Sequence, residues 1–400
     1  MASSETVYRS TNDRRLLVSR AECLRPLLAQ NARQGAVDRR LPEASIMALA
    51  EAGLFKLRMP KRYGGHEADL RTQIDVSAAI AYGDGAPGWV VGLANTCAWI
   101  VGLYSVRAQD DVFGVDPEVR ICGSSASRGT AVTVEGGVRL SGRWSYVSGC
   151  LHAHWAVLGF DLVDEAGAVI EAALALVPAV DYVVSDTWFT AGMRASGSNT
   201  LSAEDVFVPQ HRVVSRARLA AGNYPTERKD EIVYRASWAP TLTVSLIGSL
   251  LGLGRAALDH VRDAAGTKEM AATVFNRQAD SAGFQMQLAD AALRIESAYL
   301  HACRAAEDID EHAARGELPD LSARARARAD ASRAAVLVVE AITILLNAHG
   351  SGGLAESSAL QRIWQDVNNA ARHASLLPAI SLEIYGKALL GLENDIALNV

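Results

Sequence analysis

Apolar residues recur at helical spacing over the first quarter of the chain and again over its second half. The pattern predicts an amphipathic helix over residues 70–82 and a buried helix over the apolar run 89–104, which is too long for an ordinary strand. Long segments of the same kind return after about Tyr234 and are typical of an antiparallel helical bundle. We therefore expect one helical region over residues 1–115 and a second over residues 226–400.

The segment between these helical regions has the alternating pattern of β-strands. Residues 132–144 alternate apolar and polar side chains around Gly136 and Gly137, which predicts a hairpin. Further short apolar runs continue to residue 214. We expect residues 116–225 to form a compact antiparallel barrel or sandwich, which gives an α+β fold in the order α, β, α.

Composition narrows the possible functions. Hydrophobic residues make up 50% and charged residues 21% of the 400 residues, so the chain is globular with a large core. The net charge of −6 argues against nucleic acid as the main partner. The five cysteines form no CxxC pair, which favours reduced thiols in the cytoplasm. We expect no membrane span, because the apolar stretch 334–346 is too short and no secretory signal precedes it.

Three familiar kinds of site are considered and set aside. The spacing Gly252-x-Gly254 matches part of a dinucleotide fingerprint, but no second strand follows it, so we expect small residues in a packed helix. His152 and His154 would share one face of a strand, yet no third ligand lies at recognisable spacing, and we expect no metal site. No GxSxG motif selects a serine hydrolase.

Two segments carry more specific candidate chemistry. In SGRWSYVSGC (141–150), period two places Trp144 and Tyr146 on one face, and Ser148 follows at a glycine-rich bend. Such a bend can present N–H and hydroxyl groups to a flat heteroaromatic ring, although an ordinary packed hairpin is the alternative. In IWQDVNNAARHASL (363–376), His373 is expected on a helix, where a lone histidine is more often a surface or core residue.

Several segments, in this order and spacing, resemble the acyl-CoA dehydrogenase superfamily over about residues 15–392. They are MPKRYGG (59–65), SGRWSYVSG (141–149), GMRASGSNTLSAEDVFVP (192–209), LGRAALDH (253–260), QLADAALRIESA (287–298) and HGSGG (349–353). The resemblance implies an N-terminal helical domain (1–115), a central antiparallel β-barrel (116–225) and a C-terminal four-helix bundle (226–400).

Two departures from the family pattern change the implied reaction. CGSSASRG (122–129) replaces the usual serine-acid motif, and DVNNAARHASL (366–376) lacks the glutamate from which many dehydrogenases take their base. The sequence looks instead like the flavin-dependent monooxygenases of this fold, the oxygenase components of two-component hydroxylases. An amino-sugar N-oxygenase and an acyl-CoA dehydrogenase with a relocated base are the alternatives.

The resemblance also implies roles for individual residues. His373 would be the catalytic base near flavin C4a, and Ser148 would face flavin N5 with Tyr146 beside the ring. Asn95 and Trp99 would line the substrate pocket. The residues implied near the flavin's phosphate end, within the chain or across a subunit interface, are Lys268, Gly350, Ser351, Gly352 and Gly353.

The implied reaction uses reduced flavin (FADH2 or FMNH2) and O2, by way of a C4a-hydroperoxide, to hydroxylate an aromatic or polyketide-type small molecule. A dry pocket would protect the oxygen-transferring species from water. Because no nicotinamide site is recognisable, a separate NAD(P)H-dependent flavin reductase is expected to supply the reduced flavin. The resemblance further implies a cytoplasmic homotetramer, and the sequence leaves FAD and FMN as alternatives.

Overall fold

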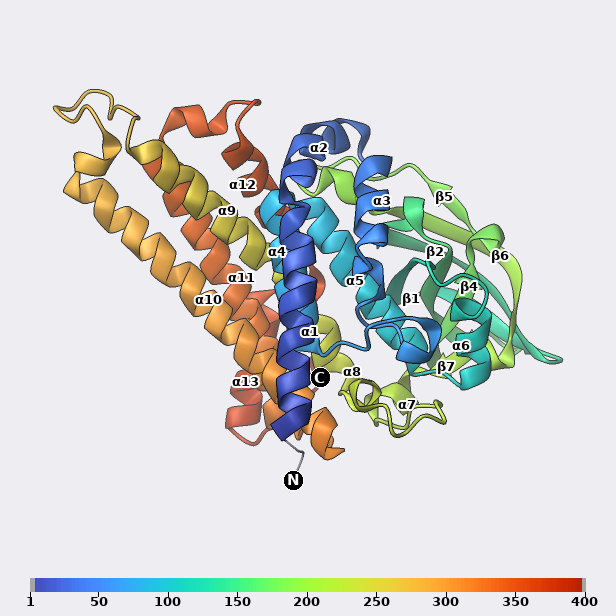
Figure 1. Ribbon diagram of the computed structural model, residues 1–400. Helices are drawn as coiled ribbons and strands as arrows, with labels where there is room; N and C mark the ends of the chain where they lie inside the picture. The colour runs from blue at the N-terminus through green and yellow to red at the C-terminus, as the bar shows by residue number, and fades with distance from the viewer. Residues whose placement is uncertain (1–3, 398–400) are drawn as a thin grey trace.

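The N-terminal region of the computed structural model, which describes residues 4–397, is helical (Figure 1). Its helices are α1 (Ser4–Cys23), α2 (Arg25–Asp38), α3 (Glu43–Glu51), α4 (Leu70–Gly83), α5 (Gly85–Gly102) and α6 (Val106–Phe113). The helices predicted over residues 70–82 and 89–104 correspond to α4 and α5. Only Asp84 separates these two helices, so α5 begins inside the glycine-rich segment.

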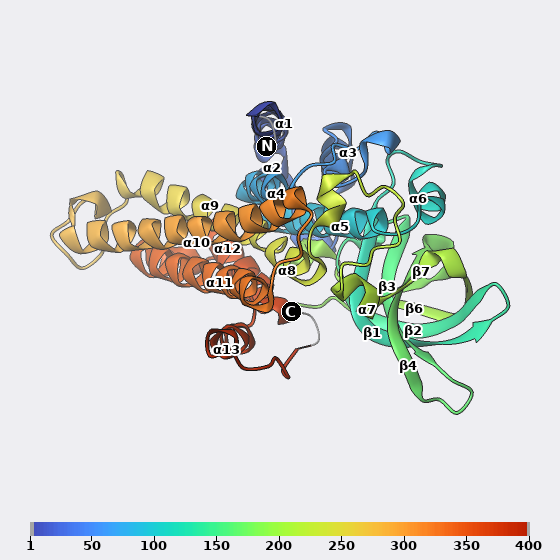
Figure 2. The same cartoon turned by 90° about the horizontal axis from the view of Figure 1, so that it is seen from below.

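A curved seven-stranded sheet follows the helices (Figure 2). Its strands are β1 (Ile121–Val134), β2 (Gly137–Val147), β3 (Trp155–Val163), β4 (Val169–Pro178), β5 (Val183–Ser185), β6 (Asn199–Pro209) and β7 (Val213–Ser215), in the order β5-β6-β2-β1-β3-β4-β7. The hairpin predicted at Gly136 is confirmed as the β1–β2 turn, where Gly136 has a φ of +80°.

The sheet differs from the expected antiparallel barrel in one pairing. Strands β1 and β3 are parallel, while the other neighbouring strands are antiparallel, so the sheet is mixed. The cause is the short 3-10 segment Cys150–His152, which follows β2 and leads into β3. Strand β3 then lies beside β1 on the edge away from β2. The chain reverses between β1 and β2 and again between β2 and β3, so β3 runs in the same direction as β1.

A β-bulge corrects the predicted arrangement of the two aromatic residues on β2. Trp144 pairs with Leu201 and Val147 pairs with Asn199, so two residues of β2 lie opposite one residue of β6. Bulges of this kind break the alternation of side chains. Trp144 is buried and donates to the Gly159 carbonyl, whereas Tyr146 is 76% exposed with a φ of +66°. The prediction that both rings share one face was therefore wrong.

Helices form the C-terminal region of the chain. They are α7 (Arg216–Ala220), α8 (Trp238–Val244), α9 (Ile247–Ala265), α10 (Ala282–Arg315), α11 (Leu321–His349), α12 (Ala359–Ala370) and α13 (Pro378–Leu389). Gly252 lies where α9 crosses α4, and a Cβ atom there would come within 2.2 Å of the Ala78 carbonyl oxygen. The Gly252-x-Gly254 spacing thus serves helix packing, as expected.

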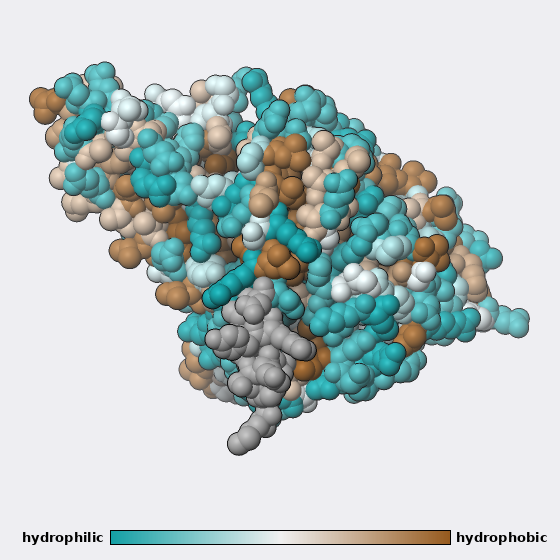
Figure 3. Space-filling view, viewed as in Figure 1, coloured by the Kyte–Doolittle hydropathy of each residue, from teal (hydrophilic) through white to brown (hydrophobic). Residues whose placement is uncertain are grey.

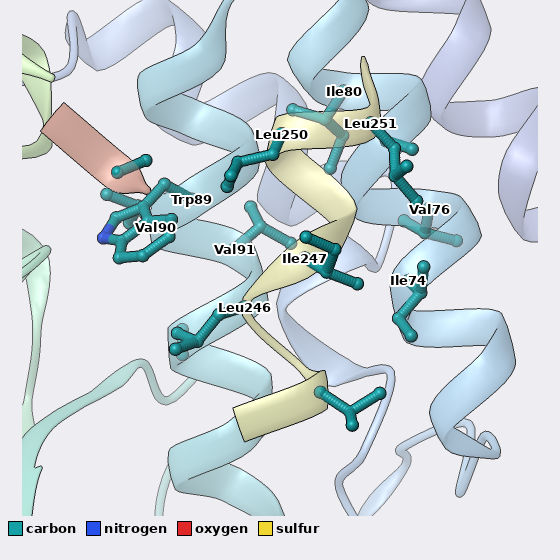
Figure 4. Packing of buried hydrophobic residues seen from close by; sticks show 14 of the residues in the cluster. Ile74, Val76, Ile80, Trp89, Val90, Val91, Leu246, Ile247, Leu250 and Leu251 are labelled. Carbon is teal, nitrogen blue, oxygen red and sulfur yellow. The ribbon is translucent and has the colours of Figure 1, made fainter. Parts of the chain in front are cut away.

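One apolar cluster joins the N-terminal helices to the bundle. In Figure 4, Leu246, Ile247, Leu250 and Leu251 lie between α4 and α5, and Trp89 lies across the cluster from Ile74 and Val76. The stretch Trp238–Ala265 is long and apolar enough to cross a membrane, but 78% of its most apolar window is buried inside the protein. It forms α8 and α9, and such burial is typical of core helices.

Candidate active site

Three side chains from three different elements meet beside the N-terminal half of α5. The indole N–H of Trp89 donates to the Ser148 hydroxyl at 3.1 Å, and Ser148 directly follows β2. The ring of Trp89 also lies edge-on to the ring of His373, with centroids 5.9 Å apart. The structure therefore brings together Ser148 and His373, which the sequence proposed separately. Sequence reasoning missed Trp89, whose only signal was its place in an apolar run.

A chain of hydroxyl groups leads from Ser148 to a backbone carbonyl. The Ser148 and Ser198 oxygens are 2.7 Å apart, and so are those of Ser198 and Ser196. Ser196 donates to the Met193 carbonyl at 2.7 Å, and a carbonyl can only accept. Each hydroxyl has one hydrogen. Ser198 must therefore donate to Ser196, and Ser148 must donate to Ser198.

This direction leaves the Ser148 oxygen as an acceptor. Its hydrogen is committed to Ser198, one lone pair accepts from Trp89, and the second lone pair remains. Reduced flavin carries an N–H at N5, whereas N5 of oxidised flavin has only a lone pair. The free acceptor on Ser148 therefore fits reduced flavin better than oxidised flavin.

Aromatic rings stand next to this hydroxyl chain. The exposed ring of Tyr146 lies edge-on to Trp188, with centroids 6.0 Å apart. The Trp188 indole N–H donates to the same Met193 carbonyl that ends the hydroxyl chain. A flat heteroaromatic ring stacks well on such surfaces. Tyr146 thus presents an exposed aromatic ring two residues before Ser148.

Helix α12 holds the loop that carries the hydroxyl chain. A carboxylate oxygen of Asp366 accepts from the Met193 backbone N–H at 2.5 Å. Burial raises the pKa of Asp366 to about 6, with the Met193 hydrogen bond and Arg362 opposing the shift. Nearby, burial and the charge of Asp366 raise the pKa of Asp84 to about 7. The hydrogen bond from Met193 to Asp366 therefore ties the loop that ends the hydroxyl chain of Ser148 to helix α12.

The local structure of His373 differs from the prediction. Helix α12 ends at Ala370, and His373 precedes the short 3-10 turn Ala374–Leu376, with a ψ of 136°. The physical reason is capping: a residue at this position leaves the helical region so that its side chain can accept from a following backbone N–H. The expectation of a helical His373 was wrong, because His373 instead caps the 3-10 turn that follows it.

Two features determine the proton state of His373. The Ser375 backbone N–H donates to Nδ1 at 3.2 Å, which places the single proton of the neutral ring on Nε2. Desolvation, and then repulsion from Arg328, lower the pKa of His373 to about 4, although the residue is exposed at the surface of the single chain. At neutral pH the ring is therefore uncharged and presents Nε2–H as a donor.

Lys268 and the glycine-rich turn lie together, but away from Ser148. The Lys268 amine is 3.9 Å from the position of a Cβ atom on Gly352, so these predicted neighbours do meet. They lie where α9 and α11 end, at the far end of the bundle from the sheet (Figure 1). His260 and His349, which the sequence analysis did not single out, lie tilted against each other with ring centroids 5.5 Å apart, and burial and then the charge of Lys268 lower the pKa of both.

Asn95 and Trp99 are fully buried on α5. The Asn95 amide donates to the Leu54 and Val91 carbonyls, and its oxygen accepts from the Arg58 backbone N–H. The Trp99 indole N–H donates to the Val233 carbonyl. Their polar atoms are thus bonded to protein, and each can present only its remaining surface to a pocket.

Comparisons with known proteins define the family. The family model for the acyl-CoA dehydrogenase N-terminal domain matches residues 16–112, and the model for the acyl-CoA dehydrogenase C-terminal domain matches residues 245–378. Among residues 4–397, no group of three or more His, Cys, Asp or Glu side chains could hold a metal ion.

Relatives narrow the branch. A flavin-dependent monooxygenase oxygenase subunit, HsaA of Rhodococcus jostii, is 33% identical over 94% of this chain and 98% of its own length. The oxygenase component of an FADH2-dependent resorcinol hydroxylase from Rhizobium sp. is 30% identical over 94% of both chains. The structure of XiaF from Streptomyces sp., in complex with FADH2 and glycerol, matches with a TM-score of 0.93 and 36% identity over 98% of this chain and 100% of that chain. The chain therefore belongs to the acyl-CoA dehydrogenase family, in its branch of two-component flavin-dependent monooxygenases.

Proposed function

We propose that this chain is the oxygenase component of a two-component hydroxylase and that it acts on an aromatic small molecule at the Ser148, Trp89 and His373 centre. The observation that carries the proposal is the directed hydroxyl chain, which leaves Ser148 as an acceptor, with Trp89 in contact with both Ser148 and His373. Reduced flavin, when bound, supplies the electrons that activate O2. The protein's own residues orient the reactants, exclude water and control protons.

Ser148 and Tyr146 would hold the flavin ring. The free lone pair of Ser148 would accept an N5–H, and the exposed ring of Tyr146 would offer apolar surface to the flavin ring. Lys268 and the turn Gly350–Gly353, including Ser351 and Gly352, would contact the phosphate end of a flavin whose ring is bound by a neighbouring subunit. Their distance from the sheet of the same chain supports this division (Figure 1).

His373 is proposed to act on the substrate's ring oxygen. The sequence interpretation made it a proton acceptor, but its lowered pKa makes it a weak base. The Ser375 hydrogen bond also occupies Nδ1. We therefore propose that the substrate binds as its phenolate, with its proton released to the solvent that reaches His373, and that Nε2–H donates to the phenolate oxygen. This hydrogen bond stabilises the anion, in which the adjacent ring carbon is rich in electrons. Asn95 and Trp99 remain proposed walls of the substrate pocket.

The proposal includes a homotetramer and a separate reductase in the cytoplasm. Three exposed apolar residues recur every seven positions along α10, namely Met286, Leu293 and Leu300, at 73%, 69% and 68% exposure. Seven-residue spacing places them on one helix face. Apolar residues are visible along this flank of the bundle in Figure 3. Such a stripe supports burial against another subunit.

The direct test is an oxygen-transfer assay on the purified chain. Chemically reduced FAD or FMN, isotopically labelled O2 and a panel of phenols are mixed with the protein, and products are analysed by mass. We expect one labelled oxygen atom in a phenolic product, formed only with reduced flavin. Release of hydrogen peroxide at the rate of free reduced flavin for every phenol, together with oxidation of an acyl-CoA, would favour the dehydrogenase alternative.

A further inference from the structure

Several buried polar atoms near α5 have no hydrogen-bond partner within the described part of the chain. They are Nε, Nη1 and Nη2 of Arg58, Oε1 of Gln73, Oγ of Ser77 and Oγ1 of Thr241. Buried side-chain polar atoms are nearly always bonded, so each exception needs an explanation. Gln73 and Ser77 lie on α4, Thr241 lies on α8, and Arg58 lies in the segment before α4.

The residues on α4 face α5 close to the proposed active site. The Gln73 amide donates to the Gly92 carbonyl and to the Thr96 hydroxyl. The Ser77 oxygen is 3.1 Å from the position of a Cβ atom on Gly92. Gly92 lies within one helical turn of Trp89. The unpartnered atoms of Gln73 and Ser77 therefore lie within about one helical turn of Trp89 along α5.

Helix α8 follows α5 in the opposite direction. Trp238 stacks on Trp99 at 6.1 Å between ring centroids, while the Ser245 carbonyl lies 3.8 Å from the Cβ position of Gly92. Thr241 lies between these two contact points on α8. The unpartnered atoms thus follow α5 from its Gly92 level toward Trp99.

Arg58 lies at the inner end of this row. Its backbone N–H donates to Asn95, and its guanidinium carbon is 5.6 Å from the centroid of the Trp99 ring. An α-helix rises about 1.5 Å per residue, so Arg58 is about 9–15 Å along α5 from Trp89.

The Arg58 guanidinium is fully buried and its charge is not neutralised by a hydrogen-bonded carboxylate. Burial lowers its pKa, and the carboxylates of Asp310 and Asp69 attract it electrostatically. However, the two oxygens of Asp310 accept from the backbone N–H groups of Leu70 and Arg71. The three guanidinium nitrogens still lack hydrogen-bond acceptors among residues 4–397, and buried donors without acceptors are strongly unfavourable, so an anionic group from outside the chain would satisfy them.

We propose that Arg58 binds a carboxylate of the substrate at the inner end of a pocket that extends along α5 from Trp89. This inference rests on the proposed function and names the substrate class. The planar guanidinium fork matches a carboxylate through two parallel hydrogen bonds. The substrate is therefore an aromatic acid whose carboxylate lies about one or two rings away from the hydroxylated carbon, with Trp99 and Trp238 at its inner end.

The test compares two probes of nearly the same shape, one with a carboxylate and one with a neutral primary carboxamide. These are 6-hydroxy-2-naphthoic acid and its primary carboxamide, and their binding to the holoenzyme with reduced flavin is measured anaerobically by naphthalene fluorescence. We expect the acid to bind about tenfold or more tightly than the amide, the size of effect typical of a hydrogen bond to a charged group. Arg58→Met should abolish this preference and leave the affinity for the amide within about threefold.

Two further variants keep the outcome decisive. Arg58→Lys retains the charge and should keep part of the preference, so it replaces Arg58→Met if the latter does not fold. Arg315→Met removes an exposed positive charge at the end of α10 and should leave the preference unchanged. Equal affinities for acid and amide in the parent, absence of binding by both, or a preference that survives in Arg58→Met would overturn the proposal. Oxygen transfer to a neutral phenol would still be seen in that case if the proposed function holds.

Discussion

Trp89 donates its indole N–H to the oxygen of Ser148 while its ring contacts His373, so one side chain fixes the spacing of the other two. Trp89 comes from the N-terminal half of α5, Ser148 from the end of β2 and His373 from the turn after α12. The relationship explains how residues far apart in the sequence form one centre. It also predicts which substitutions should affect oxygen transfer without unfolding the protein.

Ser198→Ala should uncouple flavin oxidation from hydroxylation. Without Ser198, the Ser148 hydrogen is no longer committed, and Ser148 can rotate and donate instead of accepting. The loss of one hydrogen bond of about 0.5–1.5 kcal/mol predicts a two- to tenfold rise in hydrogen peroxide released per product formed. Peroxide and product are measured together, with Ser198→Thr as the hydroxyl-retaining control. An unchanged ratio in Ser198→Ala would refute the role of the hydroxyl chain.

His373→Gln and His373→Ala should differ if donation is the role of His373. The glutamine amide can replace Nε2–H as a donor but cannot act as a base. We expect His373→Gln to retain product formation at least about tenfold above His373→Ala, because a donor to an anionic oxygen contributes about 1.5–3 kcal/mol. The measurement is single-turnover product yield. Equal loss in both variants would show that His373 must accept a proton.

Product formation should also persist in mildly acidic solution. The pKa of His373 is lowered to about 4, so the neutral ring predominates far below the usual histidine range. Protonation at Nδ1 would break the Ser375 hydrogen bond that orients the ring, so we expect any acidic limb of the rate profile that depends on His373 to lie near its lowered pKa and not near about 6.5. The limb is identified as the part of the profile absent from His373→Gln. A limb in the ordinary histidine range would contradict the described surroundings of the ring.

Asp84 and Asp366 should make the fold less stable as pH rises. Burial raises the pKa of Asp84 to about 7 and that of Asp366 to about 6, from the ordinary value of 3.8. For each group, the folded state binds more protons than the unfolded state at any pH between the ordinary and the raised pKa. The free energy of unfolding is therefore expected to fall as pH increases from about 4 to about 7, with the stabilisation fully present only at the acidic end. Denaturant titrations should show a flatter dependence in Asp84→Asn. The same slope in that variant would contradict the assignment.

Gly252→Ala should destabilise the contact between α4 and α9. The new methyl group would lie 2.2 Å from the Ala78 carbonyl oxygen, and backbone cannot move aside as a flexible side chain can. We expect a loss of about 1–3 kcal/mol in the free energy of unfolding, the usual range for overpacking. The matched control is Gly266→Ala, where no atom lies within 4 Å and the backbone φ is −72°. Equal stability of the two variants would disprove the packing role.

Much of the fold follows from local patterns. The helices α4 and α5 follow the apolar periodicity, and Gly136-Gly137 marks the β1–β2 turn. These elements are predictable because neighbouring residues alone determine the pattern. The parallel pairing of β1 with β3 and the bulge at Tyr146 depend on how distant strands are placed, and no local period records that.

The candidate site was predictable only in part. Ser148 belongs to a segment that resembles the family, and His373 to a segment that departs from its dehydrogenase pattern, whereas no local pattern marks the contacts of Trp89 and Ser198 with Ser148. His373 was misplaced on a helix because its capping bond to Ser375 outweighs the helical pattern before it. Arg58 gave no signal, since its buried and unpartnered state exists only in the tertiary structure.

The most direct test of the account measures the affinity for reduced and oxidised flavin without oxygen. Because the hydroxyl chain makes Ser148 an acceptor, the parent protein is expected to bind reduced flavin about tenfold or more tightly than oxidised flavin. Ser148→Ala should bring the ratio close to one, with little change in the affinity for oxidised flavin. Equal affinity of the parent for both redox states, or a preference that persists in Ser148→Ala, would contradict the account.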